Sequence, residues 1–73
     1  MRYRVRHTLR QWRDLAGLSQ TELGEAIGKN KDTISRWERG VTAPRADEIA
    51  LIEEVLHINW SEDVIFNAKT VTK

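Results

Sequence analysis

The spacing of glycine and proline limits this chain to short helical segments. It is interrupted at short intervals by Gly17, Gly28, Gly40 and Pro44. Glycine readily takes the positive φ that ends a helix, and proline disfavours helical dihedrals in the residue before it. Between these residues, apolar side chains recur every three or four positions and do not alternate. We therefore predict an all-α fold of four to five short helices.

The chain holds 73 residues, which suits one domain and is too short for two that each have a core. Apolar residues make up 40% and charged residues 32%, a balance typical of a globular chain and not of a disordered or membrane-spanning one. The absence of cysteine excludes disulfides and thiolate metal sites, and no apolar run typical of a signal peptide follows Met1. We expect a single domain over residues 1–73 in the cytoplasm, without a membrane anchor.

The first helix has two alternative starts. Four apolar residues share one helical face: Val5, Leu9, Trp12 and Ala16. This stripe would let the helix begin near Tyr3, whereas the capping-box spacing of Thr8 and Gln11 would start it after Thr8. In the second case residues 1–7 form a basic arm. The arginines of that arm are Arg2, Arg4 and Arg6.

The second helix has the clearest start. Ser19 and Glu22 form a capping box, in which each side chain accepts from the backbone N–H of the other residue. Leu18 and Leu23 add the matching hydrophobic staple, and Gly28 permits a sharp turn at the helix end. The next helix is expected to begin after the cap Asn30 and to end at Gly40. Ile34 and Trp37 give this helix an apolar edge.

Two more helices are expected after a loop at residues 41–44. Apolar residues at helical spacing predict a fourth helix with an acidic outer face. The apolar residues are Ile49, Ile52, Val55 and Leu56, and the acids are Asp47, Glu48, Glu53 and Glu54. Asn59 and Glu62 have cap spacing, so a fifth helix is expected through Phe66. Residues 67–73 are polar and expected to form a flexible tail.

Charge is divided unevenly along the chain. Residues 1–45 hold ten Lys and Arg against five Asp and Glu, a net +5, whereas residues 46–73 hold two against six, a net −4. A basic half suits nucleic acid, and an acidic half suits solvent or a protein partner. The alternative is a chance imbalance on a solvated surface.

The chain from residue 9 to residue 58 resembles the helix-turn-helix domain of the phage Cro and repressor (lambda-repressor-like, XRE) family. The resemblance rests on Leu18-Ser19-Gln20, Leu23-Gly24, Ile27-Gly28 and Thr33 to Gly40, leading to Pro44. It places the helix-turn-helix at residues 19–40, with the third helix in the major groove. It implies sequence-specific binding of double-stranded DNA by a small transcriptional repressor of phage, prophage, plasmid or bacterial type, held at the nucleoid through DNA.

The resemblance also implies roles for individual residues. Lys31, Asp32 and Arg36 occupy the positions that read bases, where Arg36 could bind guanine and Asp32 could accept from the cytosine amino group. Contacts with phosphates or the minor groove are expected from Gln20, Thr33, Ser35, Arg39 and Arg45. Arg13 and Glu38 occupy the positions of a charge-assisted structural pair.

Two departures from the family pattern concern the packing of the domain. Lys29 stands where the family usually has an apolar residue, so its aliphatic stem would have to cover the core. Arg45 replaces the small residue that usually caps the fourth helix, so a cap is exchanged for a DNA contact.

Trp60, with Ile65 and Phe66, either completes the core or forms an exposed patch for a second copy. A weak homodimer completed on DNA would use that patch.

No constellation in the sequence indicates catalysis, a metal site or a cofactor. His7 and His57 lie 50 positions apart without clustered ligands, and no nucleophile is paired with a base. We therefore expect no enzyme. The rival function is a protein-interaction module of the same fold, an antirepressor or antitoxin-like partner of another regulator protein, which the acidic second half favours.

Overall fold

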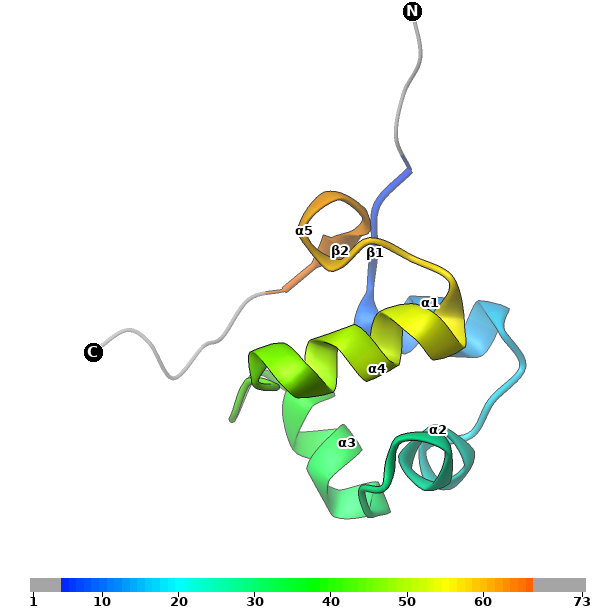
Figure 1. Cartoon of the computed structure of the whole chain (residues 1–73), viewed down its shortest axis with the longest axis vertical. Helices are drawn as coiled ribbons and strands as arrows, with labels where there is room; N and C mark the ends of the chain where they lie inside the picture. The colour runs from blue at the N-terminus through cyan, green and yellow to red at the C-terminus, as the bar shows by residue number, and fades with distance from the viewer. Residues whose placement is uncertain (1–4, 67–73) are drawn as a thin grey trace, which may run out of the picture.

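The computed structural model describes residues 5–66. Within these residues five helices confirm the predicted all-α fold, and two short strands add a ribbon to it. In chain order the elements are β1 (His7–Thr8), α1 (Leu9–Leu15), α2 (Gln20–Ile27), α3 (Lys31–Glu38), α4 (Ala46–Leu56), α5 (Trp60–Asp63) and β2 (Val64–Ile65). The ribbon and α5 lie at one end, α2 and α3 at the other, and α1 and α4 between them (Figure 1). None of the described helices is long and apolar enough to cross a membrane.

Helix α1 begins after Thr8, the later of its two predicted starts. The Thr8 hydroxyl accepts from the Gln11 N–H at 3.2 Å, and the Gln11 side chain accepts from the Thr8 N–H at 2.9 Å. Val5 lies before the helix and is 62% exposed, so the longer apolar stripe does not form. The capping box at Thr8 therefore sets the start of α1. The first backbone N–H groups of a helix lack partners within the helix, and this box supplies an acceptor for one of them.

The turn between α2 and α3 depends on two glycines that act differently. Gly28 has a φ of 77°, in the left-handed region that suits a residue without a Cβ. A Cβ added to Gly24 would collide with the carbonyl oxygen of Lys29, so Gly24 lets the turn fold back onto α2. The backbone N–H of Lys29 donates to the Gly24 carbonyl at 2.7 Å and fixes this approach.

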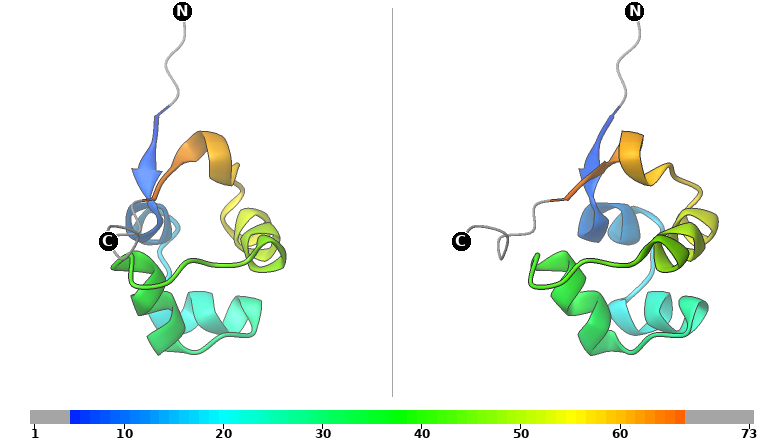
Figure 2. Two further views of the ribbon diagram at one scale, coloured as in Figure 1. Left: turned by 90° about the vertical axis from the view of Figure 1, so that its left-hand side faces the viewer. Right: turned by 60° about the vertical axis from the view of Figure 1, so that its left-hand side comes forward.

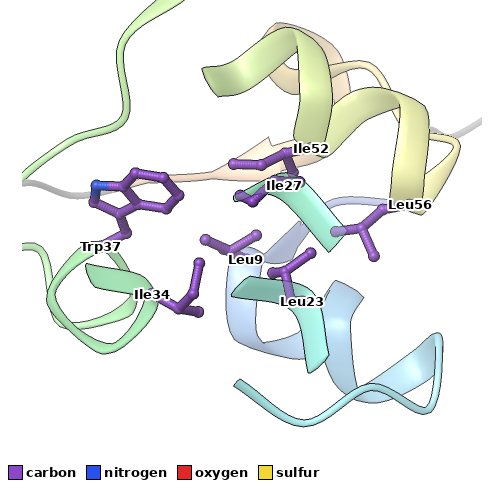
Figure 3. Packing of buried hydrophobic residues seen from close by; sticks show 7 residues of the cluster. All are labelled: Leu9, Leu23, Ile27, Ile34, Trp37, Ile52 and Leu56. Atoms are coloured by element: carbon purple, nitrogen blue, oxygen red, sulfur yellow. The ribbon is translucent and has the colours of Figure 1, made fainter. Parts of the chain in front are cut away.

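The core lies where α1, α2, α3 and α4 meet. Seven buried side chains converge there (Figure 3): Leu9, Leu23, Ile27, Ile34, Trp37, Ile52 and Leu56. Leu23, Ile34 and Ile52 are completely shielded from solvent. This packing fixes the inner edge of α3, so the opposite edge faces outward at a defined angle.

The fourth helix differs from the prediction in its acidic face. The Glu48 side chain is only 9% exposed, and the Lys29 ammonium lies 2.5 Å from its carboxylate. Its other oxygen accepts from the Arg45 backbone N–H at 2.8 Å, which caps α4 in place of an Arg45 side-chain acceptor. The Glu53 carboxylate accepts from the Trp60 N–H at 2.8 Å. Only two of the four acids, Asp47 and Glu54, remain on the exposed surface of α4.

The C-terminal part of the described chain also departs from the prediction. The fifth helix does not run through Phe66, because α5 ends at Asp63 and the next two residues form β2. Strand β2 lies beside β1 in a parallel ribbon (Figure 2). Its register pairs His7 with Val64 and Thr8 with Ile65.

Side chains from the start of the chain hold this segment extended. Trp12 Nε1 donates to the Asp63 carbonyl at 2.8 Å, and the Arg6 guanidinium donates to the Val64 carbonyl at 2.8 Å. Val64 is 3% exposed, so its burial against the domain favours the strand over a further helical turn. Arg6 is therefore bound to the ribbon and does not extend as an arm. Residues 1–4 of the expected arm and the expected tail at residues 67–73 lie outside the described residues.

Candidate functional site

The outer edge of α3 presents polar and charged side chains to solvent. Lys31, Asp32 and Arg36 are all exposed, and none of their side chains forms a hydrogen bond or ion pair with the residues from 5 to 66. On the opposite edge, Ile34 and Trp37 are 0% and 3% exposed. The three residues predicted to read bases therefore lie together on a rigidly mounted surface.

A basic groove runs along one side of this edge, between α3, α1 and the start of α2. It encloses about 630 Å³. Its lining includes the cations Arg10, Lys31 and Arg39 together with Gln20 and Ser35. The nearest acid to Arg10 is Asp14 at 3.8 Å, and Arg10 is 72% exposed, so that pair is largely screened by solvent. The groove has the charge and the donors to receive an anion.

Arg13 and Glu38, the expected structural pair, meet beneath the groove. Arg13 Nε donates to Glu38 Oε2 at 2.6 Å, and Arg13 Nη2 donates to Glu38 Oε1 at 3.2 Å. The hydrogen bond with Glu38 raises the pKa of Arg13 above its ordinary value, although burial opposes the shift. Arg13 Nη1 also donates to the Leu18 carbonyl at 2.8 Å, just before α2 begins. The pair thus connects α1, the start of α2 and the end of α3.

Gln20 joins the same cluster from the first residue of α2. Its Nε2 donates to Glu38 Oε1 at 2.9 Å. The cap of α2 forms beside it, because the Ser19 hydroxyl accepts from the Glu22 N–H at 3.0 Å and the Glu22 carboxylate accepts from the Ser19 N–H at 2.8 Å. Gln20 therefore lines the groove at a helix N-terminus, where the partial positive charge of the helix favours anions.

The lining of the groove includes two more of the residues expected to contact phosphates, Ser35 and Arg39. Arg39 Nε donates to Ser35 Oγ at 3.2 Å, which leaves the serine proton available to another acceptor. Thr33 is not among the residues that line the groove, and its hydroxyl and its backbone N–H both donate to the Asn30 side chain, at 3.0 and 2.9 Å, and cap α3. Arg45 lies outside the groove and is 72% exposed, with Asp47 at 3.5 Å.

A second groove, of about 500 Å³, lies between the ribbon and the end of α3 and has both apolar and polar lining residues. Its apolar lining includes Val41, Ile65 and Phe66, and its polar lining residues are Thr8, Glu38 and Arg39. Val41 is 41% exposed and Ile65 39% exposed. The structure places Trp60 against the core, where its ring also lies 5.7 Å from the ring of Phe66. Trp60 therefore contacts the core while it remains partly exposed, and its part in a patch for a second copy stays a prediction.

Three interactions around the site were not predicted from the sequence. They are the bonds from Gln20 to Glu38, from Lys29 to Glu48 and from Arg6 to the Val64 carbonyl. Each joins residues at least 18 positions apart, so no local spacing indicates it. Glu48 alone carried a usable signal, because it stands three residues after Arg45 at the position of a capping glutamate. Among residues 5–66, no three His, Asp or Glu side chains gather as metal ligands would.

The comparisons agree with this geometry. A family model described as Helix-turn-helix matches residues 9–62, which include all of α1 to α4. Comparison with curated proteins and with solved structures gave no match. The matched family consists of DNA-binding regulators and is not a family of enzymes. The chain therefore belongs to the helix-turn-helix family of DNA-binding transcription regulators, of the Cro and repressor type that its sequence resembles.

Proposed function

We propose that this protein is a small transcriptional repressor, of phage, prophage, plasmid or bacterial type, that acts in the cytoplasm by binding a specific double-stranded DNA sequence. The observation that carries this proposal is the outer edge of α3, where Lys31, Asp32 and Arg36 are exposed and unpaired among the described residues. The major groove is about 12 Å wide and admits one α-helix. Side chains on the exposed edge of such a helix can reach the base edges.

Arg36 and Asp32 give the proposed reader opposite chemical preferences. Arg36 can donate two hydrogen bonds to O6 and N7 of guanine, whereas Asp32 can only accept and suits the amino group of cytosine. The two residues lie four positions apart, which along a helix is a rise of about 6 Å, or roughly two base-pair steps. Asp32 also repels phosphates, so it favours a register in which it faces bases and disfavours non-specific binding.

The basic groove supplies the contacts that position α3. Arg39 provides charge for a phosphate, while Gln20 and Ser35 provide neutral donors. Exposed Arg45 at the start of α4 is proposed as a further contact with the DNA backbone or the minor groove. These contacts fix the orientation of the domain and carry no base preference.

Salt-dependent binding to duplex DNA tests this function against its rival. Each phosphate contacted by a cation makes the logarithm of affinity fall with the logarithm of salt by a slope of about 0.9. We expect the affinity of wild-type protein for mixed duplex to fall steeply with salt, and the slope to be smaller for Arg39→Ala. The slope of Arg10→Ala, which removes another cation of the same groove, is measured for comparison. The exposed acids Asp47 and Glu54 favour the rival, a module that binds another regulator protein. No duplex binding at any salt concentration would support that rival.

We further propose a second copy of the chain as the partner at the second groove, against its apolar residues. One recognition helix reads only a few base pairs, so two copies on half-sites about 34 Å apart would add affinity and specificity. Val41, Ile65 and Phe66 supply the apolar area, with Trp60 behind them. Arg39 lines both grooves, so pairing here would place the second copy beside the DNA-binding side. The exposed apolar area of this groove is small, so we expect the two copies to associate weakly in solution and to form the dimer on DNA.

Sedimentation of free protein and titration onto DNA test the pairing. We expect a monomer or weak dimer in solution, and cooperative binding to a selected palindrome but not to its isolated half-site. Ile65→Lys should abolish the cooperativity and preserve half-site affinity. Equal affinity per site on both duplexes would show that the chain binds as a monomer.

A further inference from the structure

Glu38, the last residue of α3, is a buried carboxylate shared between two donors. Its side chain is 5% exposed. It accepts twice from Arg13, at 2.6 and 3.2 Å, and once from Gln20, at 2.9 Å. Arg13 neutralises its charge, so an anion entering the groove meets a pair without net charge.

The bond to Glu38 fixes which way the Gln20 carboxamide faces. An ionised carboxylate can only accept hydrogen bonds, so the amide nitrogen of Gln20, and not its oxygen, must point toward Glu38. The nitrogen has two protons, and this bond uses one of them. The second N–H remains available on the side chain that lines the basic groove.

We propose that Glu38 is a positioning residue for DNA binding, which acts by holding the Gln20 carboxamide with its free N–H available to a backbone phosphate. This inference rests on the proposed function, because it requires a phosphate in the basic groove. Without Glu38 the carboxamide could rotate and present its oxygen, which a phosphate repels. Prior orientation also removes the entropy cost of ordering a flexible side chain when DNA binds.

The variant Glu38→Gln tests this role with nearly the same side-chain shape. Its amide no longer dictates the orientation of Gln20, so we expect duplex affinity to fall about three- to tenfold, as for losing one pre-ordered side chain. The substitution also leaves Arg13 without its counter-charge beside the groove, an electrostatic effect that it exerts with or without the Gln20 side chain. Ile52→Val is the matched control: it weakens the core away from the groove, and its duplex affinity should equal that of wild type.

A double-mutant cycle separates positioning from a general structural effect. In the Gln20→Ala background, Glu38→Gln should cause no further loss of affinity, because the side chain that it orients is gone. The same three- to tenfold loss in both backgrounds would overturn the proposal. If wild-type protein bound no duplex at all, the proposed function itself would fail. If wild-type protein bound duplex but the two substitutions showed no coupling, only the role of Glu38 would fail.

An NMR measurement on wild-type protein keeps the proposal testable should Glu38→Gln not fold. In the free protein the Gln20 side-chain amide should be ordered, with nitrogen relaxation close to that of the helix backbone. On titration with duplex, the proton that does not face Glu38 should shift and the other should stay. A mobile Gln20 amide in the free protein, or equal shifts of both protons, would contradict the proposed role of Glu38.

Discussion

At the scale of single residues, Glu48 explains how a lysine is accommodated in the helix-turn-helix turn. Lys29 replaces an apolar residue that the resemblance leads one to expect, and its ammonium ends on the buried carboxylate of Glu48 at 2.5 Å. The backbone N–H of Arg45 and then the ammonium of Lys29 hold the pKa of Glu48 below its ordinary value of 4.5. One carboxylate thus caps α4 and ties the turn to it.

The depressed pKa of Glu48 predicts a specific loss of stability in acid. Because the folded protein favours the ionised form, this stabilisation is present above about pH 4.5 and is lost as the pH falls through the lower folded-state pKa. Glu48→Gln should lower the free energy of unfolding by about 1 kcal/mol at pH 7 and by less at pH 3. Urea unfolding at both values measures this. Asp47→Asn is the control, since Asp47 is 71% exposed, and an equal pH dependence in both variants would contradict the assignment.

At the scale of helices, the Arg13–Glu38 pair sets how α1 and α3 are joined. Replacing Arg13 with methionine keeps most of the side-chain length but leaves the Glu38 carboxylate buried without its cation. We expect Arg13→Met to lower the free energy of unfolding by about 3 to 5 kcal/mol. Arg10→Met, on an exposed position of the same helix, should change it by less than about 0.5 kcal/mol. Similar losses in denaturant titrations of both variants would show that the pair contributes little.

The turn between α2 and α3 predicts an order between two glycine substitutions. Alanine is the better helix former at position 24, yet the Cβ of Gly24→Ala would meet the Lys29 carbonyl and displace the turn. Gly28→Ala meets no neighbouring atom within 4 Å, so its cost is the left-handed backbone alone, about 1 to 2 kcal/mol. We expect Gly24→Ala to be the more destabilising in urea titrations. The reverse order would mean that the turn relaxes easily.

At the scale of the whole molecule, the sequence predicts what is encoded locally and misses what depends on distant contacts. The cap at Ser19 lies within one helical turn of the group that it satisfies, so its spacing alone locates the start of α2, and the equally local cap at Thr8 is one of the two starts predicted for α1. The parallel ribbon joins residues 57 positions apart, and no period in either strand indicates its partner. The extended conformation of Val64 depends on Arg6 and on burial, which outweigh the local preference for another helical turn.

The same distinction holds for the candidate site. The exposed edge of α3 follows from its helical period, because burial of Ile34 and Trp37 places Lys31, Asp32 and Arg36 outside. The orientation of the carboxamide on α2 could not be predicted in this way. It depends on a carboxylate 18 residues away, which only the packing of three helices brings within 2.9 Å.

Selection of duplexes from a randomised pool shows whether α3 reads bases while the groove beside it holds the DNA backbone. Wild type, Arg36→Ala and Gln20→Ala would be compared for affinity and for base preference at every position. We predict that Arg36→Ala loses about 1 to 3 kcal/mol and its preference at one base pair, whereas Gln20→Ala binds all sequences more weakly with an unchanged preference. An Arg36→Ala protein that selects the same base as wild type at every position would contradict the account.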